Sequence, residues 1–99
     1  MMRSVVVSDT VQNKLAELTD YLRSNLKLSE KAATDYRGRF VTFIGSFSAN
    51  VDYPLCRFKR WRALGYRCAV FEKDWILAYE VFDDGVIVRD MSHAKLLKE

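Results

Sequence analysis

Apolar residues in the first half of the chain recur at helical spacing. A short β-branched run within residues 3–7 predicts a first strand. The Ser8-Asp9-Thr10 run follows and supplies capping residues for a helix. The apolar stripe of this helix advances by three or four residues at a time and consists of Val11, Leu15, Leu18, Leu22 and Leu26.

A second helix is predicted after a short break at Lys27-Leu28. Ser29 and Glu30 suit its first turn, because a hydroxyl caps free backbone amides and a carboxylate is stabilised by the positive end of a helix. Its buried stripe is rich in aromatic rings and consists of Tyr36, Phe40, Phe43, Ile44 and Phe47. We expect an antiparallel helical hairpin, since the connection is short.

Strand-like segments fill the chain beyond Asp52-Tyr53-Pro54, where proline prevents a helix from continuing. We predict strands at Arg57–Leu64, Tyr66–Glu72, Trp75–Phe82 and Val86–Met91, then a helical turn at Ala94–Glu99. The most regular of these strands places four apolar side chains on one face: Trp75, Leu77, Tyr79 and Val81. The Asp84-Gly85 pair is a hairpin signal, and tight turns make neighbouring strands antiparallel.

The order of these elements predicts an α+β fold. It comprises an N-terminal strand, an antiparallel helical hairpin and a mostly antiparallel sheet of three to four strands. A length of 99 residues with 49% hydrophobic residues fits one globular domain, 1–99, without repeats or a linker.

The two cysteines, Cys56 and Cys68, match neither a redox CxxC motif nor a zinc motif, although their spacing leaves a disulfide open. The apolar run Val5–Val7 is too short for a signal peptide, and no stretch is long enough to span a membrane. We therefore expect a cytoplasmic protein with reduced thiols and no membrane association.

Positive charge is concentrated in one segment of the chain. The net charge is +3, yet residues 57–67 alone carry five Lys or Arg and no acidic residue. Aromatic residues are interleaved with these cations, a combination that suits the phosphates and unpaired bases of a single-stranded nucleic acid. The alternative is a solvated strand whose aromatic rings belong to the core. The candidate RNA-binding residues are Arg57, Lys59, Trp61, Arg62, Arg89 and Lys95.

His93 is the only histidine and is expected at the end of the last strand. A rigid strand end is a good position for a group that transfers protons near neutral pH, although a lone histidine is more often a surface or capping residue. Asp74 has two interpretations as well, a partner of a catalytic base or a turn residue. No ligand set for a metal and no nucleotide-binding or serine-hydrolase motif is present in the sequence, so we expect no cofactor.

Several short motifs in order resemble the RelE/ParE superfamily of bacterial toxins. They are Gly65-Tyr66-Arg67, the Asp-Trp-x-Leu-x-Tyr run from Asp74, the Asp-Gly-Val run from Asp84, and Ser92-His93 followed by Leu96. The second and the last resemble the YafQ branch in particular, and the strand–helix–helix order extends the resemblance over nearly the whole chain. The resemblance implies a toxin that a partner antitoxin neutralises and that cleaves mRNA on the ribosome without a metal.

The resemblance also implies catalytic positions. Arg67 matches the arginine of the Gly-Tyr-Arg motif, His93 the closing histidine of the YafQ branch and Asp74 its aspartate, while Arg60 falls near a catalytic lysine of RelE. The chain departs from the pattern where the YafQ branch has further histidines, at Tyr53 and near Val70. Leu96-Leu97 also stand where the RelE branch has a catalytic tyrosine.

Three functions follow from these residues. The leading hypothesis is a ribosome-dependent mRNA endoribonuclease with His93 as acid or base and the arginines as phosphate ligands. The second is a ParE-like inhibitor of DNA gyrase, since one fold can serve several functions. The third is a nucleic-acid-binding protein of the same fold without catalysis.

Overall fold

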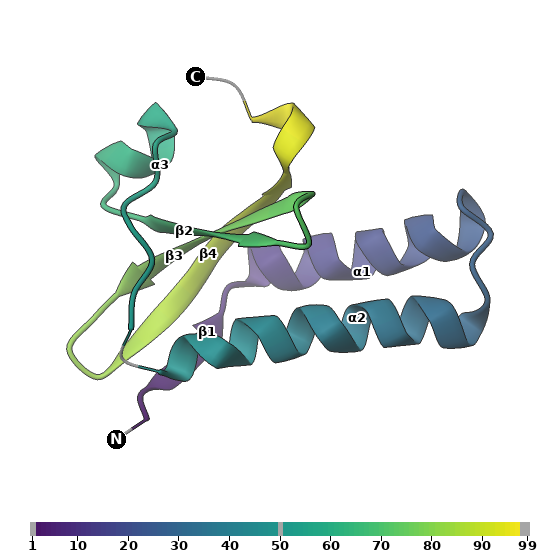
Figure 1. Cartoon of the computed structure of the whole chain (residues 1–99), viewed down its shortest axis with the longest axis horizontal. Coiled ribbons are helices and arrows are strands. Elements are labelled where there is room, and N and C mark those ends of the chain that lie inside the picture. Colours follow the sequence, from purple (N-terminus) through teal and green to yellow (C-terminus); the bar gives the residue numbers. More distant parts are fainter. Residues whose placement is uncertain (1, 50, 98–99) are drawn as a thin grey trace.

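The computed structural model describes residues 2–49 and 51–97 and has the predicted α+β architecture (Figure 1). Strand β1 (Ser4–Val7) leads into helices α1 (Asp9–Ser24) and α2 (Glu30–Gly45). The 3-10 turn η1 (Ser46–Ser48) and the short helix α3 (Lys59–Ala63) precede the other strands. These are β2 (Arg67–Phe71), β3 (Trp75–Val81) and β4 (Gly85–His93), and the 3-10 turn η2 (Ala94–Leu96) follows.

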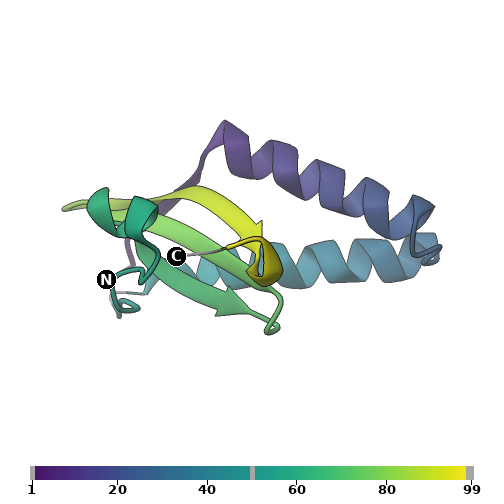
Figure 2. The same cartoon turned by 90° about the horizontal axis from the view of Figure 1, so that it is seen from above.

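Serine caps begin both long helices, as the sequence predicts. The Ser8 hydroxyl accepts a hydrogen bond from the Val11 amide, and the Ser29 hydroxyl accepts one from Ala32. The two helices form a hairpin that extends past the sheet, so that its connecting loop lies far from the strands (Figures 1 and 2). The predicted apolar stripe is one residue too long, because α1 ends at Ser24 and Leu26 is 53% exposed.

The four strands form one mixed sheet in the order β1-β4-β3-β2. Strands β2, β3 and β4 are antiparallel neighbours, whereas β1 pairs in parallel with the first half of β4. Gly85 begins β4 and lies opposite Ser4 of β1. A side chain there would place its Cβ 2.7 Å from the Ser4 carbonyl oxygen, so this position needs glycine. The turn before it is centred on Asp83 and Asp84, and the Phe82 amide donates to the Gly85 carbonyl.

The two faces of the sheet pack against different parts of the chain. The larger core lies between the sheet and the helical hairpin, and it includes Val11, Leu15, Phe40, Ile44, Phe71, Leu77, Tyr79 and Met91. A smaller core lies under α3, where Phe58 and Trp61 pack with Ile76 and Ala78. Strand β3 is therefore buried on both faces, which explains its nearly continuous apolar sequence. Val81, at its end, is exposed instead of joining the buried face.

The predicted strand at Arg57–Leu64 is wrong. Residues Lys59–Ala63 form α3, because Phe58 and Trp61 are three residues apart and a helical turn brings both rings onto the sheet. Strand β4 is also longer than predicted and runs through to His93.

The expectation of reduced thiols is contradicted as well. Cys56 and Cys68 form a disulfide, with their Cα atoms 4.8 Å apart. Pairing of Leu55 with Arg67 beside the edge of β2 brings the two cysteines together, and sequence spacing does not reveal this register. In the described part of the chain, no helix is long and apolar enough to cross a membrane.

Candidate nucleic-acid interface

His93 lies at the end of β4, as predicted, and its ring is held in place from two sides. It pairs across the sheet with Trp75, and the two rings meet edge to face with centroids 5.3 Å apart. Its Nδ1 accepts a hydrogen bond from the Lys95 amide at 3.2 Å. Because Nδ1 accepts this hydrogen bond, the neutral ring carries its proton on Nε2, which is left to donate a hydrogen bond to a ligand.

Asp74 lies beside this strand end. The turn before it has positive φ at Glu72 and Lys73, the backbone of a tight hairpin turn. The Asp74 carbonyl then accepts a 2.7 Å hydrogen bond from the Ala94 amide, which fixes the β2–β3 turn against the end of β4. The structure therefore brings Asp74 and His93 to the same corner of the sheet.

A pocket of about 640 Å³ opens at this corner, between α1 and the end of the sheet. Its wall is mainly apolar and includes Leu18, Tyr21, Leu22, Trp75 and Met91. Its polar groups are Lys14, Glu17, Asp74, Ser92 and His93. An apolar hollow with a few convergent polar groups is the usual form of a ligand site.

A second hollow of about 470 Å³ lies beside the same strand end and is lined by two of the basic residues of α3. Lys59 and Arg60 line it together with Phe58 and Trp61. Three residues line both hollows, namely Lys14, Ser92 and Leu96. Arg60 and His93 are therefore brought to neighbouring hollows around the end of β4.

Lys14 is a site residue that no pattern in the sequence indicates. Its ammonium group donates to an Asp90 carboxylate oxygen at 2.6 Å and to the Met91 carbonyl at 2.9 Å. Strand β1 pairs only as far as Val88, so the edge of β4 beyond that point is free for α1 to approach. Lys14 closes this edge, and no local sequence pattern signals such a contact between two elements.

The basic residues of α3 and its flanks, Arg57, Lys59, Arg60 and Arg62, form what we call the basic cap. All four are exposed, and within residues 2–49 and 51–97 none of them forms an ion pair. Trp61 differs, because it is only 5% exposed and its ring belongs to the smaller core. It cannot offer the open face that stacking on a base requires, so the cap supplies charge without this aromatic platform.

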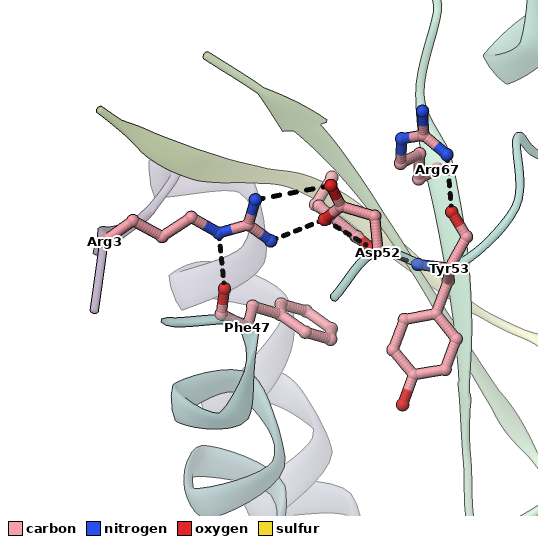
Figure 3. Close-up of polar contacts among 6 residues, drawn as sticks. Arg3, Phe47, Asp52, Tyr53 and Arg67 are labelled. Carbon is pink, nitrogen blue, oxygen red and sulfur yellow. Dashed lines mark hydrogen bonds and ion pairs between the residues drawn. The ribbon is translucent and has the colours of Figure 1, made fainter. Parts of the chain in front are cut away.

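Arg67 lies apart from His93. On β3, its cross-strand partner is Tyr79, whereas that of His93 is Trp75. These two positions are four residues apart along β3, roughly 13 Å. The Arg67 guanidinium donates to the Tyr53 carbonyl at 2.8 Å (Figure 3). The structure does not bring this predicted catalytic arginine to the corner that holds His93 and Asp74.

A polar network surrounds this arginine. Arg3 donates to the Asp52 carboxylate and to the Phe47 carbonyl (Figure 3). The Tyr79 hydroxyl donates to Asp52 and accepts from the Tyr53 amide. The hydrogen bond from Arg3 lowers the pKa of Asp52, and burial raises the pKa of Tyr79. These contacts join the residue before β1, the turn η1 and strand β3 to the segment that leads into the cap, and we therefore assign the network a structural role.

The two remaining candidate cations differ in their surroundings. Arg89 pairs with Glu80 at 2.9 Å on the sheet, so its charge is already compensated. Lys95 is exposed on η2, next to His93. No cluster of three or more His, Cys, Asp or Glu residues that could hold a metal ion occurs among the described residues.

Comparison with known proteins adds no assignment. No protein-family model matches the chain, and a search of curated proteins finds no match.

Proposed function

We propose that this protein is the toxin of a type II toxin–antitoxin system, a metal-independent endoribonuclease that cleaves mRNA on the ribosome. The observation that carries the proposal is the arrangement around the end of β4. A histidine held through Nδ1 lies there beside one hollow, and a cap of exposed cations without carboxylate partners borders the next. The resemblance of the closing motifs to the RelE/ParE superfamily supports the same function.

In the proposed reaction, the 2′-hydroxyl of a ribose gives its proton to a water molecule, its oxygen attacks the adjacent phosphorus, and the bond to the 5′-oxygen breaks. Arg60 and Lys59 bind the phosphate and stabilise the negative charge that develops on it. In its doubly protonated form, in which Nδ1 no longer accepts from the Lys95 amide, His93 gives the proton of Nε2 to the departing 5′-oxygen and becomes neutral. Asp74 lines the same pocket as His93 and would orient the substrate or a water molecule there. The products are a 2′,3′-cyclic phosphate and a 5′-hydroxyl.

The decisive experiment is primer extension on a defined mRNA with its codon in the ribosomal A site. We expect discrete cuts by the parent and a loss of at least about a hundredfold in rate for His93→Ala, the usual contribution of an acid–base group. Arg37→Ala is the matched control, because Arg37 is an exposed cation of α2 with no ion pair among the described residues. Full cutting by folded His93→Ala would refute the assignment.

Inhibition of DNA gyrase is a second candidate, and one observation favours it. Arg67 donates to a backbone carbonyl at the far end of β3 from His93, so the acid–base corner lacks the arginine that the resemblance implies. Loss of supercoiling by purified gyrase in the presence of the protein, with intact mRNA in the ribosome assay, would select this function. If the protein binds RNA but neither cleaves mRNA nor inhibits gyrase, the third hypothesis, a non-catalytic RNA-binding protein, would be selected.

An antitoxin partner is part of the proposal. Three of the large apolar side chains that line the pocket beside His93 are exposed: Tyr21, Leu26 and Leu96. An amphipathic antitoxin helix could cover them and close the pocket. The test is co-expression with a small acidic protein that a neighbouring gene encodes. This protein should restore growth, and in the purified complex it should protect these residues from hydrogen exchange.

A further inference from the structure

The disulfide encloses the most basic part of the chain. Cys56 directly precedes Arg57, Cys68 directly follows Arg67, and the two cysteines are 12 positions apart. All five cations of residues 57–67 lie within this covalent loop, and no acidic residue does. The bond therefore closes a loop that consists of the basic cap and the arginine next to it.

Few other contacts order this loop. Its helix, α3, has five residues, far too short to be stable by itself. Phe58 and Trp61 anchor it to the sheet, and backbone hydrogen bonds join Cys56 to Tyr66 and Cys68 to Pro54. Four exposed cations without carboxylate partners repel one another inside the loop. Opening of the disulfide would therefore release a segment that its own charges drive apart.

The bond can be opened by an ordinary exchange reaction. Cys56 is 1% exposed, whereas Cys68 is partly exposed, so attack by a thiolate is directed to the Cys68 sulfur. Cys56 leaves as a thiolate and takes a proton from water, and the second thiol of a dithiol reductant then releases Cys68. Two electrons pass from the dithiol to the protein, and the reductant ends as a disulfide.

We propose that the Cys56–Cys68 disulfide is a redox switch that sets the order of the basic loop and, through it, the affinity for RNA. The oxidised loop holds its cations in one arrangement, and reduction by a dithiol loosens it and weakens RNA binding. In a reducing compartment such as the expected cytoplasm, disulfides serve mainly catalysis and redox sensing, and a low-molecular-weight disulfide would re-form this bond by the reverse exchange. The RNA part of this inference rests on the proposed function.

Limited digestion with trypsin tests the effect on the loop without RNA. Arg57, Lys59, Arg60 and Arg62 are cleavage sites inside the loop, while Arg37 and Arg39 in α2 are internal reference sites. Reduction by dithiothreitol should speed cleavage in the loop about fivefold or more and leave the α2 sites nearly unchanged, because only the local opening equilibrium shifts. Reoxidation should restore the slow rate. Equal rates in both states would overturn the switch.

Fluorescence anisotropy with a labelled single-stranded RNA of about 12 nucleotides, within the usual range of single-strand binding sites, tests the consequence. We expect the Kd to rise about threefold to tenfold on reduction. Cys56→Ser/Cys68→Ser should bind like the reduced parent under both conditions. Equal Kd values for the oxidised and reduced parent would overturn the regulation alone. Absence of binding in both states would refute the RNA function, and the proposed regulation would fall with it.

Discussion

The core between hairpin and sheet and the core under the basic cap are stabilised in different ways. The first spreads its apolar contacts over α1, α2 and three strands, and aromatic rings such as Phe40, Phe71 and Trp75 meet within it. The second rests on two aromatic anchors and a disulfide under a five-residue helix. The protein thus combines a hairpin-and-sheet core, which many contacts hold together, with a basic cap that only a few contacts hold in place. Substitutions that change function should therefore disturb the fold less in the basic cap than in the larger core.

Removal of an aromatic ring from the larger core should have the greatest effect on stability. Phe40 is fully buried against Phe71 and Trp75. Phe40→Ala should lower the free energy of unfolding by about 3–5 kcal/mol, measured by urea denaturation. The control is Val41→Ala on the exposed side of the same helix, with an expected loss below about 1 kcal/mol. Similar losses for both variants would contradict the distributed core.

Removal of the anchor of the cap should cost less. Trp61→Ala should lower the free energy of unfolding by about 2 kcal/mol, because the cap can open locally while the hairpin and sheet remain packed. Hydrogen exchange should accelerate at residues 58–68 and stay unchanged in α1. Arg62→Ala, an exposed neighbour in α3, is the matched control. Accelerated exchange throughout the sheet would show that the cap is an integral part of the main core.

The difference between the two regions also explains what the sequence could predict. The sequence predicts the helical hairpin correctly because its signals are local. They are the helical spacing of Val11, Leu15 and Leu22 and the serine caps before both helices. The strand predicted for residues 57–64 is wrong because the spacing of Phe58 and Trp61 fits either a strand or a helical turn. Their packing on the sheet, which the local sequence does not reveal, favours the helical turn. The disulfide depends on the pairing of Leu55 with Arg67, and the parallel pairing of β1 with β4 is equally non-local.

The candidate site shows the same division. His93 and Asp74 could be selected from the sequence, since His93 ends one recognisable strand and Asp74 directly precedes another. Lys14 and the pocket wall from α1 could not, because they approach β4 only in the folded chain. The separation of Arg67 from His93 was equally hidden, as both are motif residues and only the strand register places them four residues apart along β3.

The polar network that joins the two regions should have a smaller, pH-dependent effect. The pKa of Asp52 lies below its ordinary value of 3.8 because Arg3 donates to its carboxylate. The contribution of the Arg3–Asp52 ion pair to the free energy of unfolding is therefore present above the unfolded-state pKa of Asp52. This contribution is lost as the pH falls through the lower folded-state pKa. Asp52→Asn should lose about 1 kcal/mol at neutral pH, measured by urea denaturation, and this difference from the parent should shrink in acid. Asp83→Asn, in an exposed turn, is the control, and a pH-independent loss for Asp52→Asn would contradict the ion pair.

The smallest effect on stability is expected at Arg60, where the effect on binding should be clear. Arg60 is exposed and packs into neither core, so Arg60→Ala should change the free energy of unfolding by less than about 0.5 kcal/mol. If its guanidinium binds a phosphate, the slope of log Kd for single-stranded RNA against log salt concentration should fall by about 0.7, the contribution of one phosphate contact. Arg37→Ala carries the same charge change on α2 and should leave the slope unaltered. An equal fall in both variants would mean that RNA responds to net charge alone, and the basic cap would then have no special part in binding.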